Sequence, residues 1–218
     1  MRLAIATLAI AFTFTVIAPV RLRADATSRP AVPADPSTPR GALKALATAM
    51  TAGDADTIKR LLLAGTPTEQ RMVSLMSDMA VSIAQLNKAM IGRFGRKPAS
   101  AVLGGDPDET LARSLADLDA ATERIDGDTA TVGTVSQSFM LKKAANGEWR
   151  IAVSEMSKDT TSAQVEEKAT VLSGQMKAMH EITTGIADGK YATAADAASA
   201  LHAKMGGGAT APTTAPNQ

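Results

Sequence analysis

The residues best suited to metal chemistry in this chain of 218 residues are its two histidines, His180 and His202. His180 directly follows Met179, and Met176 lies about one turn earlier on a predicted helix. Thioether and imidazole groups are ligands that copper accepts, so these side chains could form a copper site. The methionines that could complete it are Met72, Met76 and Met79. Methionine also fills gaps in a core that is poor in aromatic residues, and we favour that role, with no metal and no cofactor.

Two short charged segments could bind ions. The acids of segment 106–109 could hold a cation, but they lack the alternating spacing and central glycine of a calcium loop. Acids are also common in the first turn of a helix, where they complement the helix dipole, and we favour that role. In segment 92–98, GRFGRKP, the side chains of Arg93, Arg96 and Lys97 could bind an anion. We expect instead that they end a long helix, where positive charge is favourable.

No nucleophile stands in a recognisable catalytic motif. The serines form no Gly-x-Ser-x-Gly elbow and no Ser-x-x-Lys motif, and the glycines form no phosphate-binding loop. The chain has no cysteine, which excludes thiol nucleophiles, thiolate metal sites and disulfides. We therefore assign no catalytic residue and favour a non-enzymatic protein.

The elements that would position a site are helical except over residues 119–156, where apolar and polar side chains alternate as in strands. A three-residue loop at 145–147 puts the large apolar side chains of a hairpin on one face, whereas a two-residue loop inverts the faces. Gly147 would supply the left-handed conformation that the longer loop needs. The cross-strand pairs that follow are Lys143–Trp149, Leu141–Ile151 and Phe139–Val153.

A second turn is predicted at residues 126–128, Asp-Gly-Asp. It would join a short strand near Thr122–Ile125 to a strand that starts at Thr129. Apolar residues before and after Gly133 differ in parity, so they would point to opposite faces of one straight strand. A bulge near Gly133 would reconcile them.

Two long helices are predicted, one opening at Thr66-Pro67 and one running from about Ser162 to Ile186. In each, apolar residues recur at alternating steps of four and three. The two seams are Met72, Met76, Met79, Ile83, Leu86 and Met90, and Val165, Ala169, Leu172, Met176 and Met179. We expect the two helices to pack on each other; the alternative is that one seam pairs with another copy of the protein.

Shorter helices are predicted around the long ones. The first opens at Thr38-Pro39 and stops at Gly53, and a second, capped by Asp54 or Asp56, carries Ile58, Leu61 and Leu62. Another starts at the segment 104–107, and an alanine-rich helix covers roughly residues 193–204. Helices of this number beside one small sheet predict an α+β fold.

Three features together resemble the NTF2-like (SnoaL-like) superfamily. They are the AGDAD break at 52–56 after the first helix, the DGDTATV turn and strand at 126–132, and the KKAANGEWRI hairpin at 142–151. The resemblance covers residues 39–156 and implies helices packed on a small curved antiparallel sheet, cone-shaped, with a pocket between them. Enzymatic members hold an Asp, His or Tyr set in that pocket. This chain has no histidine before His180, and its single tyrosine is Tyr191.

A pocket of that kind would have an apolar wall. The residues that would supply it are Phe139, Leu141, Trp149, Ile151 and Val153. The same residues could simply form the core. Two rivals to a binding module stay open: a pocket enzyme that uses acids such as Glu123 or Glu148, and an assembly protein that binds a partner through its long helices.

Residues 1–26 are predicted to be a signal peptide. Arg2 supplies the positive start, an uncharged apolar run follows, and Ala24 and Ala26 flank a small-x-small cleavage site. An uncleaved anchor is the alternative, because a run of roughly 16–18 apolar residues is near the lower limit for crossing a bilayer. We expect cleavage after Ala26 and a periplasmic or secreted protein, or a membrane-anchored one if cleavage fails.

Composition divides the rest of the chain. The predicted parts are a Pro-rich linker at 27–38, a single α+β domain at 39–205 whose residues 157–205 are a helical extension, and a disordered tail at 206–218. Cleavage would remove three basic residues and one acid, which leaves a net charge of −1. That charge gives no electrostatic case for nucleic acid or a membrane surface. We expect an exported binding or interaction module that takes a small apolar ligand or a protein partner. A homodimer is compatible with this expectation.

Overall fold

Capping side chains set where the helices begin. The computed structural model describes residues 34–157 and 160–205. The helices are α1 (Pro39–Ala52), α2 (Ala55–Leu61), α3 (Pro67–Phe94), α4 (Arg96–Leu103), α5 (Pro107–Ala120), α6 (Val153–Ser157), α7 (Ser162–Ala187) and α8 (Ala194–Lys204). The threonines that accept a hydrogen bond from a backbone N–H of the first turn are Thr38, Thr66, Thr161 and Thr193. Because the caps fix these starts, the predicted positions of α1, α3, α7 and α8 are confirmed.

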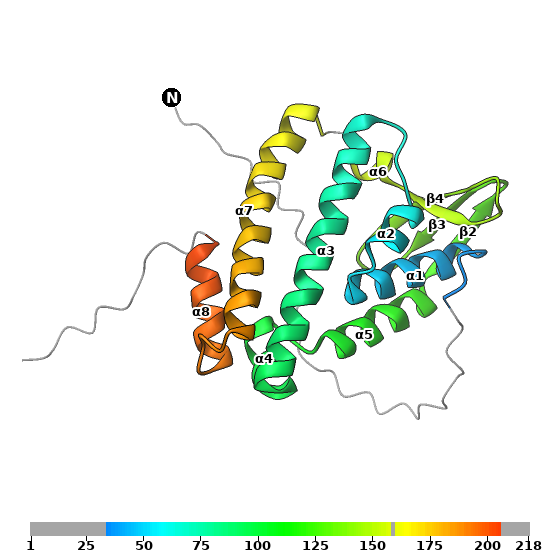
Figure 1. Cartoon of the computed structure of the whole chain (residues 1–218). Helices are drawn as coiled ribbons and strands as arrows, with labels where there is room; N and C mark the ends of the chain where they lie inside the picture. The colour runs from blue at the N-terminus through cyan, green and yellow to red at the C-terminus, as the bar shows by residue number, and fades with distance from the viewer. Residues whose placement is uncertain (1–33, 158–159, 206–218) are drawn as a thin grey trace, which may run out of the picture. The chain divides into compact units, whose positions relative to one another are not determined.

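The strands form one open, mixed sheet, and the α+β fold class is confirmed (Figure 1). They are β1 (Leu62–Leu63), β2 (Thr122–Asp126), β3 (Thr129–Gly133), β4 (Ser138–Lys143) and β5 (Trp149–Ala152). Their spatial order is β1-β5-β4-β3-β2. All neighbouring pairs are antiparallel except β1 and β5, which run parallel.

The predicted hairpin register is confirmed at the turn and wrong at its far end. Leu141 pairs with Ile151, and Lys143 pairs with Trp149. Gly147 has φ 84°, a conformation that favours glycine, and its N–H donates to the carbonyl of residue 144. The Phe139–Val153 pair does not form, because β5 ends at residue 152 and Val153 begins α6.

The predicted bulge at Gly133 is wrong, because a hairpin turn changes the parity there. β3 and β4 are separate strands, and Gly133 pairs with Ser138 at the end of their ladder. Residues 134–137 form the turn between them, and Val135 at its tip is fully exposed. Val132 of β3 then pairs with Phe139 of β4, so the two side chains share a face despite their different parity.

Two predicted helix ends are also wrong. α2 ends at Leu61, and Leu62 instead belongs to β1, opposite Ile151 of β5. α3 ends at Phe94, and Gly95 follows it in a non-helical conformation. The basic residues at 96 and 97 therefore begin α4 rather than ending α3.

α1, α2 and one side of α3 cover the apolar face of the sheet. Side chains from these helices, from α5 and from the strands form a cluster that we call the sheet-side core. Its most deeply buried members include Ile58 and Leu61 of α2, Val132 of β3 and Leu141 of β4, each fully buried. Val73 of α3 also belongs to it.

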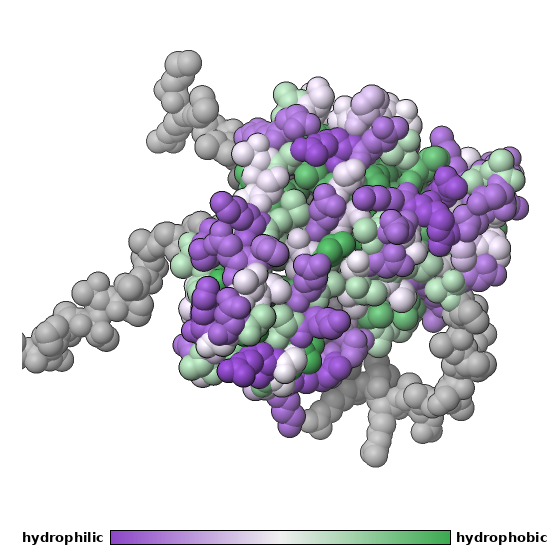
Figure 2. Space-filling view, viewed as in Figure 1, coloured by the Kyte–Doolittle hydropathy of each residue, from purple (hydrophilic) through white to green (hydrophobic). Residues whose placement is uncertain are grey.

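The opposite side of α3 packs along α7, and the predicted pairing of the two long helices is confirmed. Near the N-terminal ends of the two helices, Leu75 of α3 packs in one cluster with Val165 of α7. Near their C-terminal ends, Met90 of α3 packs in another cluster with Ile182 of α7. The two helices therefore run in the same direction, side by side (Figure 1). Ile83, predicted within the seam, is 44% exposed and lies outside the contact. On the face drawn in Figure 2, apolar residues show only in small areas between hydrophilic ones.

α8 folds back along α7 and also contacts α4. The cluster at this end of the molecule contains buried side chains of α3, α4, α7 and α8, and we call it the helical-end core. No helix within residues 34–157 and 160–205 is long and apolar enough to cross a membrane. The predicted signal peptide and tail fall outside the residues that the structure describes.

Candidate functional site: an apolar groove beside helix α8

The five residues predicted to line a pocket lie in the sheet-side core. Leu141, Trp149, Ile151 and Val153 are at most 3% exposed, and Phe139 is half-buried against them. The backbone N–H of Trp149 donates to a carbonyl at 2.8 Å, and the ammonium of Lys143 lies 5.8 Å from the centre of its ring. These residues join the sheet to α1 and α2 through packed contacts.

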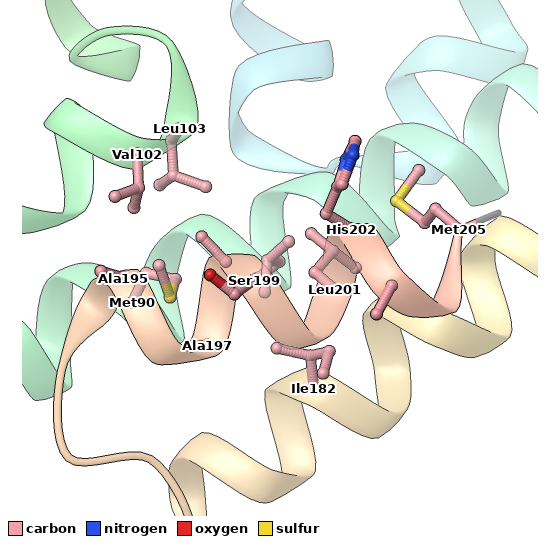
Figure 3. Close-up of a pocket in the computed structure, with 13 residues that line it drawn as sticks. Met90, Val102, Leu103, Ile182, Ala195, Ala197, Ser199, Leu201, His202 and Met205 are labelled. Atoms are coloured by element: carbon pink, nitrogen blue, oxygen red, sulfur yellow. The ribbon is translucent and has the colours of Figure 1, made fainter. Parts of the chain in front are cut away.

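A groove of about 1100 Å³ lies instead among α3, α4, α7 and α8 (Figure 3). Its floor consists of Leu86 and Met90 from α3 and Ile182 from α7, each at most 4% exposed. Val102 and Leu103 of α4 form one wall. The other wall is α8, with Ala195, Ala197, Ala198, Ser199, Leu201, His202 and Ala203, and Met205 just beyond its end. The groove is therefore mostly apolar, with a buried floor and an α8 wall that is largely exposed to solvent.

The alanines of α8 explain why space remains there. A methyl side chain reaches only a short distance from the helix, so α8 and α4 can touch without filling the volume between them. Ala194 and Ala197 anchor α8 in the helical-end core, and both are buried. Val102 and Met205, at the rims, are 36% and 40% exposed, which leaves apolar surface facing the opening. Groove and rim together are mostly apolar.

Two contacts hold α8 against α7. Tyr191, just before α8, lies over Gly185, where a Cβ atom would stand 2.8 Å from its ring. At the other end the Lys204 ammonium binds the Glu181 carboxylate at 2.6 Å. The hydrogen bond to Lys204 lowers the pKa of Glu181, and the same bond raises the pKa of Lys204. Both contacts fix one wall of the groove in place.

Among the residues that the structure describes, two with polar side chains, Ser199 and His202, line the groove, and both are exposed. They are three residues apart on α8, so they lie on the same side of that helix, as Figure 3 shows. Neither has a hydrogen-bond partner among the described residues. A serine hydrolase would need the imidazole oriented by an acid and bonded to the hydroxyl, and neither bond is present. The two groups can instead serve as hydrogen-bonding groups for a ligand.

The residues considered for copper point apart. Met179 is 5% exposed in the helical-end core, whereas His180, the next residue, is exposed on the outer side of α7. Within residues 34–157 and 160–205, no three His, Asp or Glu side chains are grouped so that they could hold a metal ion. The methionines act as core residues.

The acidic and basic segments bind each other. Arg96 donates to Asp106 at 2.8 Å and to Asp108 at 2.7 Å, and Asp106 also caps α5. The hydrogen bond from Arg96 lowers the pKa of Asp106, so that carboxylate stays charged within the pair. Arg96, Asp106 and Asp108 of the two predicted ion sites are therefore bonded to one another.

The acids considered for a pocket enzyme are also paired. Glu123 lies 3.5 Å from the Arg40 guanidinium and accepts the Arg40 backbone N–H. Glu148 binds Arg60 at 2.6 Å. Neither lines the groove, so neither can act on a molecule bound there.

Sequence reasoning missed the groove because it missed α4, one of its walls. Pro98 stands at the third position of α4, in the first turn, where a proline is tolerated. The alanine-rich composition of α8 was the available signal, since it predicts a helix that packs without filling volume.

Comparison with models of known protein families found no match, and neither did a comparison with curated proteins. A search of the solved structures also found no match. A functional proposal must therefore be argued from the groove, with its buried floor and two polar groups.

Proposed function

We propose that this protein is an exported, non-enzymatic module that binds an elongated apolar small molecule in the groove beside α8. The observation that carries the proposal is a groove of about 1100 Å³ with a fully apolar floor. Small-molecule sites are typically concave, mostly apolar and supplied with a few polar groups that orient the ligand. The groove has each of these properties.

The lining predicts the chemical class of the ligand. The α8 wall extends from residue 195 to residue 205, a length of about 15 Å at the usual rise of a helix. An extended apolar body fits along it over Met90 and Ile182. Ser199 and His202 would hydrogen-bond a polar end group. These features favour a single-chain amphiphile such as a fatty acid.

A binding role agrees with the chemistry that the groove offers. Its polar groups form no nucleophile–base–acid set, and the paired acids Glu123 and Glu148 lie outside it. A ligand would therefore be held and released unchanged. The exposed apolar rims at Val102 and Met205 supply the entrance.

We further propose that residues 39–156 are a modified relative of the NTF2-like superfamily. The support is the order of α1 and α2 followed, after α5, by the β2–β5 strands on which they pack. Where the pocket of that superfamily is expected, this chain has packed Leu141, Trp149 and Ile151. Binding would then have moved to the C-terminal helices.

Export is the part of the proposal that rests on residues 1–26. N-terminal sequencing of the protein from its native cells tests it. We expect a chain that starts after Ala26, released from the cytoplasm. Recovery of an intact Met1 in a membrane fraction would contradict it.

Calorimetric titration with dodecanoate tests the binding function. We expect saturable binding at one ligand per chain, and its loss in Ala198→Phe, because a large side chain would fill the groove. The matched control is Ala112→Phe, on the exposed side of α5, which should bind like the wild type. No binding by the wild type, or equal binding by both variants, would overturn the proposal. Capture of an amphipathic helix in place of dodecanoate would favour the interaction role.

A further inference from the structure

β2 is an edge strand with an unpaired outer side. It stands last in the strand order, and no other described strand pairs with its free edge. All five of its residues, Thr122–Asp126, are exposed. The opposite edge is β1, which has only two residues. Edge strands expose backbone donors and acceptors that can pair with another chain, so β2 is the place where this sheet can be extended.

The turn at the end of β2 determines which backbone groups face outward. β2 and β3 are joined by two residues, and Asp126 pairs with Thr129 across that turn. In a tight hairpin such a closing pair is hydrogen-bonded, and bonded pairs then alternate along the strands. Arg124 therefore bonds to β3, whereas Glu123 and Ile125 direct their N–H and C=O groups to the free edge.

We propose that β2 pairs antiparallel with β2 of a second copy, about a two-fold axis that passes beside Ile125. In this register Ile125 of one copy faces Ile125 of the other, and their outward backbone groups bond to each other. Arg124 of each copy then lies opposite Asp126 of the other, so two opposite-charge pairs flank an apolar one. Such cross-strand pairs stabilise an antiparallel sheet.

Charge excludes the neighbouring registers. A two-fold axis requires each register to be centred on one residue facing its own copy. Centring on Arg124 puts two guanidinium groups directly opposite, and centring on Glu123 puts two carboxylates opposite; like charges so placed are destabilising. Only the Ile125 register pairs apolar with apolar and positive with negative.

The charges that this register uses are free. Among the described residues neither Arg124 nor Asp126 takes part in an ion pair, whereas Glu123 is held by Arg40. Ile125 is 53% exposed, although its neighbours across the sheet, Ala130 and Leu141, are buried. Self-pairing would cover Ile125 on one face of the edge and bring the unpaired charges of Arg124 and Asp126 together on the other face.

The pairing is independent of the groove. Figure 1 places β2 and α8 at opposite sides of the part of the chain that the structure describes. The interface is short, so the dimer should form at high protein concentration and weaken as the protein is diluted. Ligand binding should be the same in both states.

Sedimentation equilibrium on the purified protein tests the register. Arg124→Asp places two carboxylates opposite, and Asp126→Arg places two guanidinium groups opposite, so each should weaken self-association about tenfold or more. The double variant, Arg124→Asp with Asp126→Arg, restores both pairs with reversed sign and should restore the dimer. Lys142→Asp, on β4 away from the edge, should leave the dimer unchanged.

Each outcome decides the proposal. A wild type that stays monomeric at millimolar concentration would overturn it. A dimer that survives both single exchanges, or that the double exchange fails to restore, would also overturn it. Because Arg124 and Asp126 are exposed and make no ion pair among the described residues, the variants should keep the fold, and an unchanged circular dichroism spectrum checks that. Dodecanoate binding is measured on the same samples, so loss of the dimer and loss of the groove are distinguished.

Discussion

The two cores of this protein differ in how they fill space. The sheet-side core uses branched and aromatic side chains, such as Ile58, Ile151 and Trp149, that meet across the interface between helices and sheet. The helical-end core also has large side chains, such as Ile182, but its α8 side is built mainly from alanines, such as Ala194 and Ala197. The first core is packed at the residues where a pocket was expected, and the second leaves a groove. The small side chains on the α8 side, rather than the number of elements that meet, therefore account for the space that remains at the helical end.

We also expect the sheet-side core to be more rigid than the groove. β-branched and aromatic residues have few rotamers and hold fixed positions on a strand. Methionine has three rotatable bonds and adapts to irregular surroundings. Met90 and Met205 at the groove can thus adjust to molecules of different shape, whereas the residues around Trp149 cannot. We expect the groove to accept a range of apolar chains.

The largest effect should follow from removing one wall of the helical-end core. Deletion of residues 162–218 removes α7 and α8 and exposes Leu86 and Met90 on α3. A long apolar stripe in water drives association, so the truncated protein should aggregate or form a new oligomer in light scattering. Deletion from residue 206 onward is the control and should leave the thermal midpoint and size unchanged. A monomer with the wild-type melting temperature after deletion of 162–218 would contradict the pairing of α3 and α7.

A charge placed in the sheet-side core should have the next largest effect. Ile151 is 2% exposed and pairs with Leu141, so Ile151→Asp buries an unpaired carboxylate. We expect the free energy of unfolding to fall by about 4 kcal/mol or more in urea titrations. The control is Lys142→Asp on the other face, which should be neutral or slightly stabilising because residue 142 faces Arg150. Equal losses in the two variants would show that the faces are assigned wrongly.

Truncation of one side chain in each core sharpens the comparison. Leu141 is fully buried and Met90 is 1% exposed. Leu141→Ala leaves an enclosed cavity and should cost about 3–4 kcal/mol of unfolding free energy, whereas Met90→Ala should cost about 2 kcal/mol because it only widens the groove. Denaturant titrations of both variants measure the two losses. A larger loss for Met90→Ala would mean that the groove is closed in solution.

The smallest effect concerns the ion pair that ties α8 to α7. The pKa of Glu181 is lowered by its bond to Lys204, so this contribution is present above the ordinary carboxyl pKa and is lost as pH falls through the lowered value. Glu181→Gln should therefore speed amide hydrogen exchange in α8 slightly at neutral pH. Below the lowered pKa the variant and the wild type should exchange alike. A difference that persists in acid would show that the pair does not hold α8.

The sequence predicted those elements whose signals are local. Caps such as Thr66 and Thr193 fix helix starts within four residues, and the alternation around Gly147 fixes the hairpin register. β1 escaped prediction because its two residues are defined only by pairing with β5, far along the chain. The turn at 134–137 was not predicted, because a shift in the alternation of apolar residues can arise either from a bulge within one strand or from a turn between two strands.

The groove could not be predicted because it is a volume between four helices that are distant in sequence. Each of its residues has an ordinary local explanation: Ala198 favours a helix, Met90 fills a core and Leu103 belongs to an amphipathic face. Four of the predicted wall residues share one face of the sheet, whereas Val153 lies in α6, and the side chains of all five pack into the core.

Methyl-resolved NMR during a titration with dodecanoate compares the two cores in one measurement. Methyl groups of Leu103, Ile182 and Leu201 line the groove, and those of Leu141 and Ile151 lie in the sheet-side core. We predict saturable chemical-shift changes in the groove methyls and none in the sheet-side methyls. Shifts confined to the sheet-side methyls, or no shift in either set, would contradict the proposal that the helical end holds a ligand.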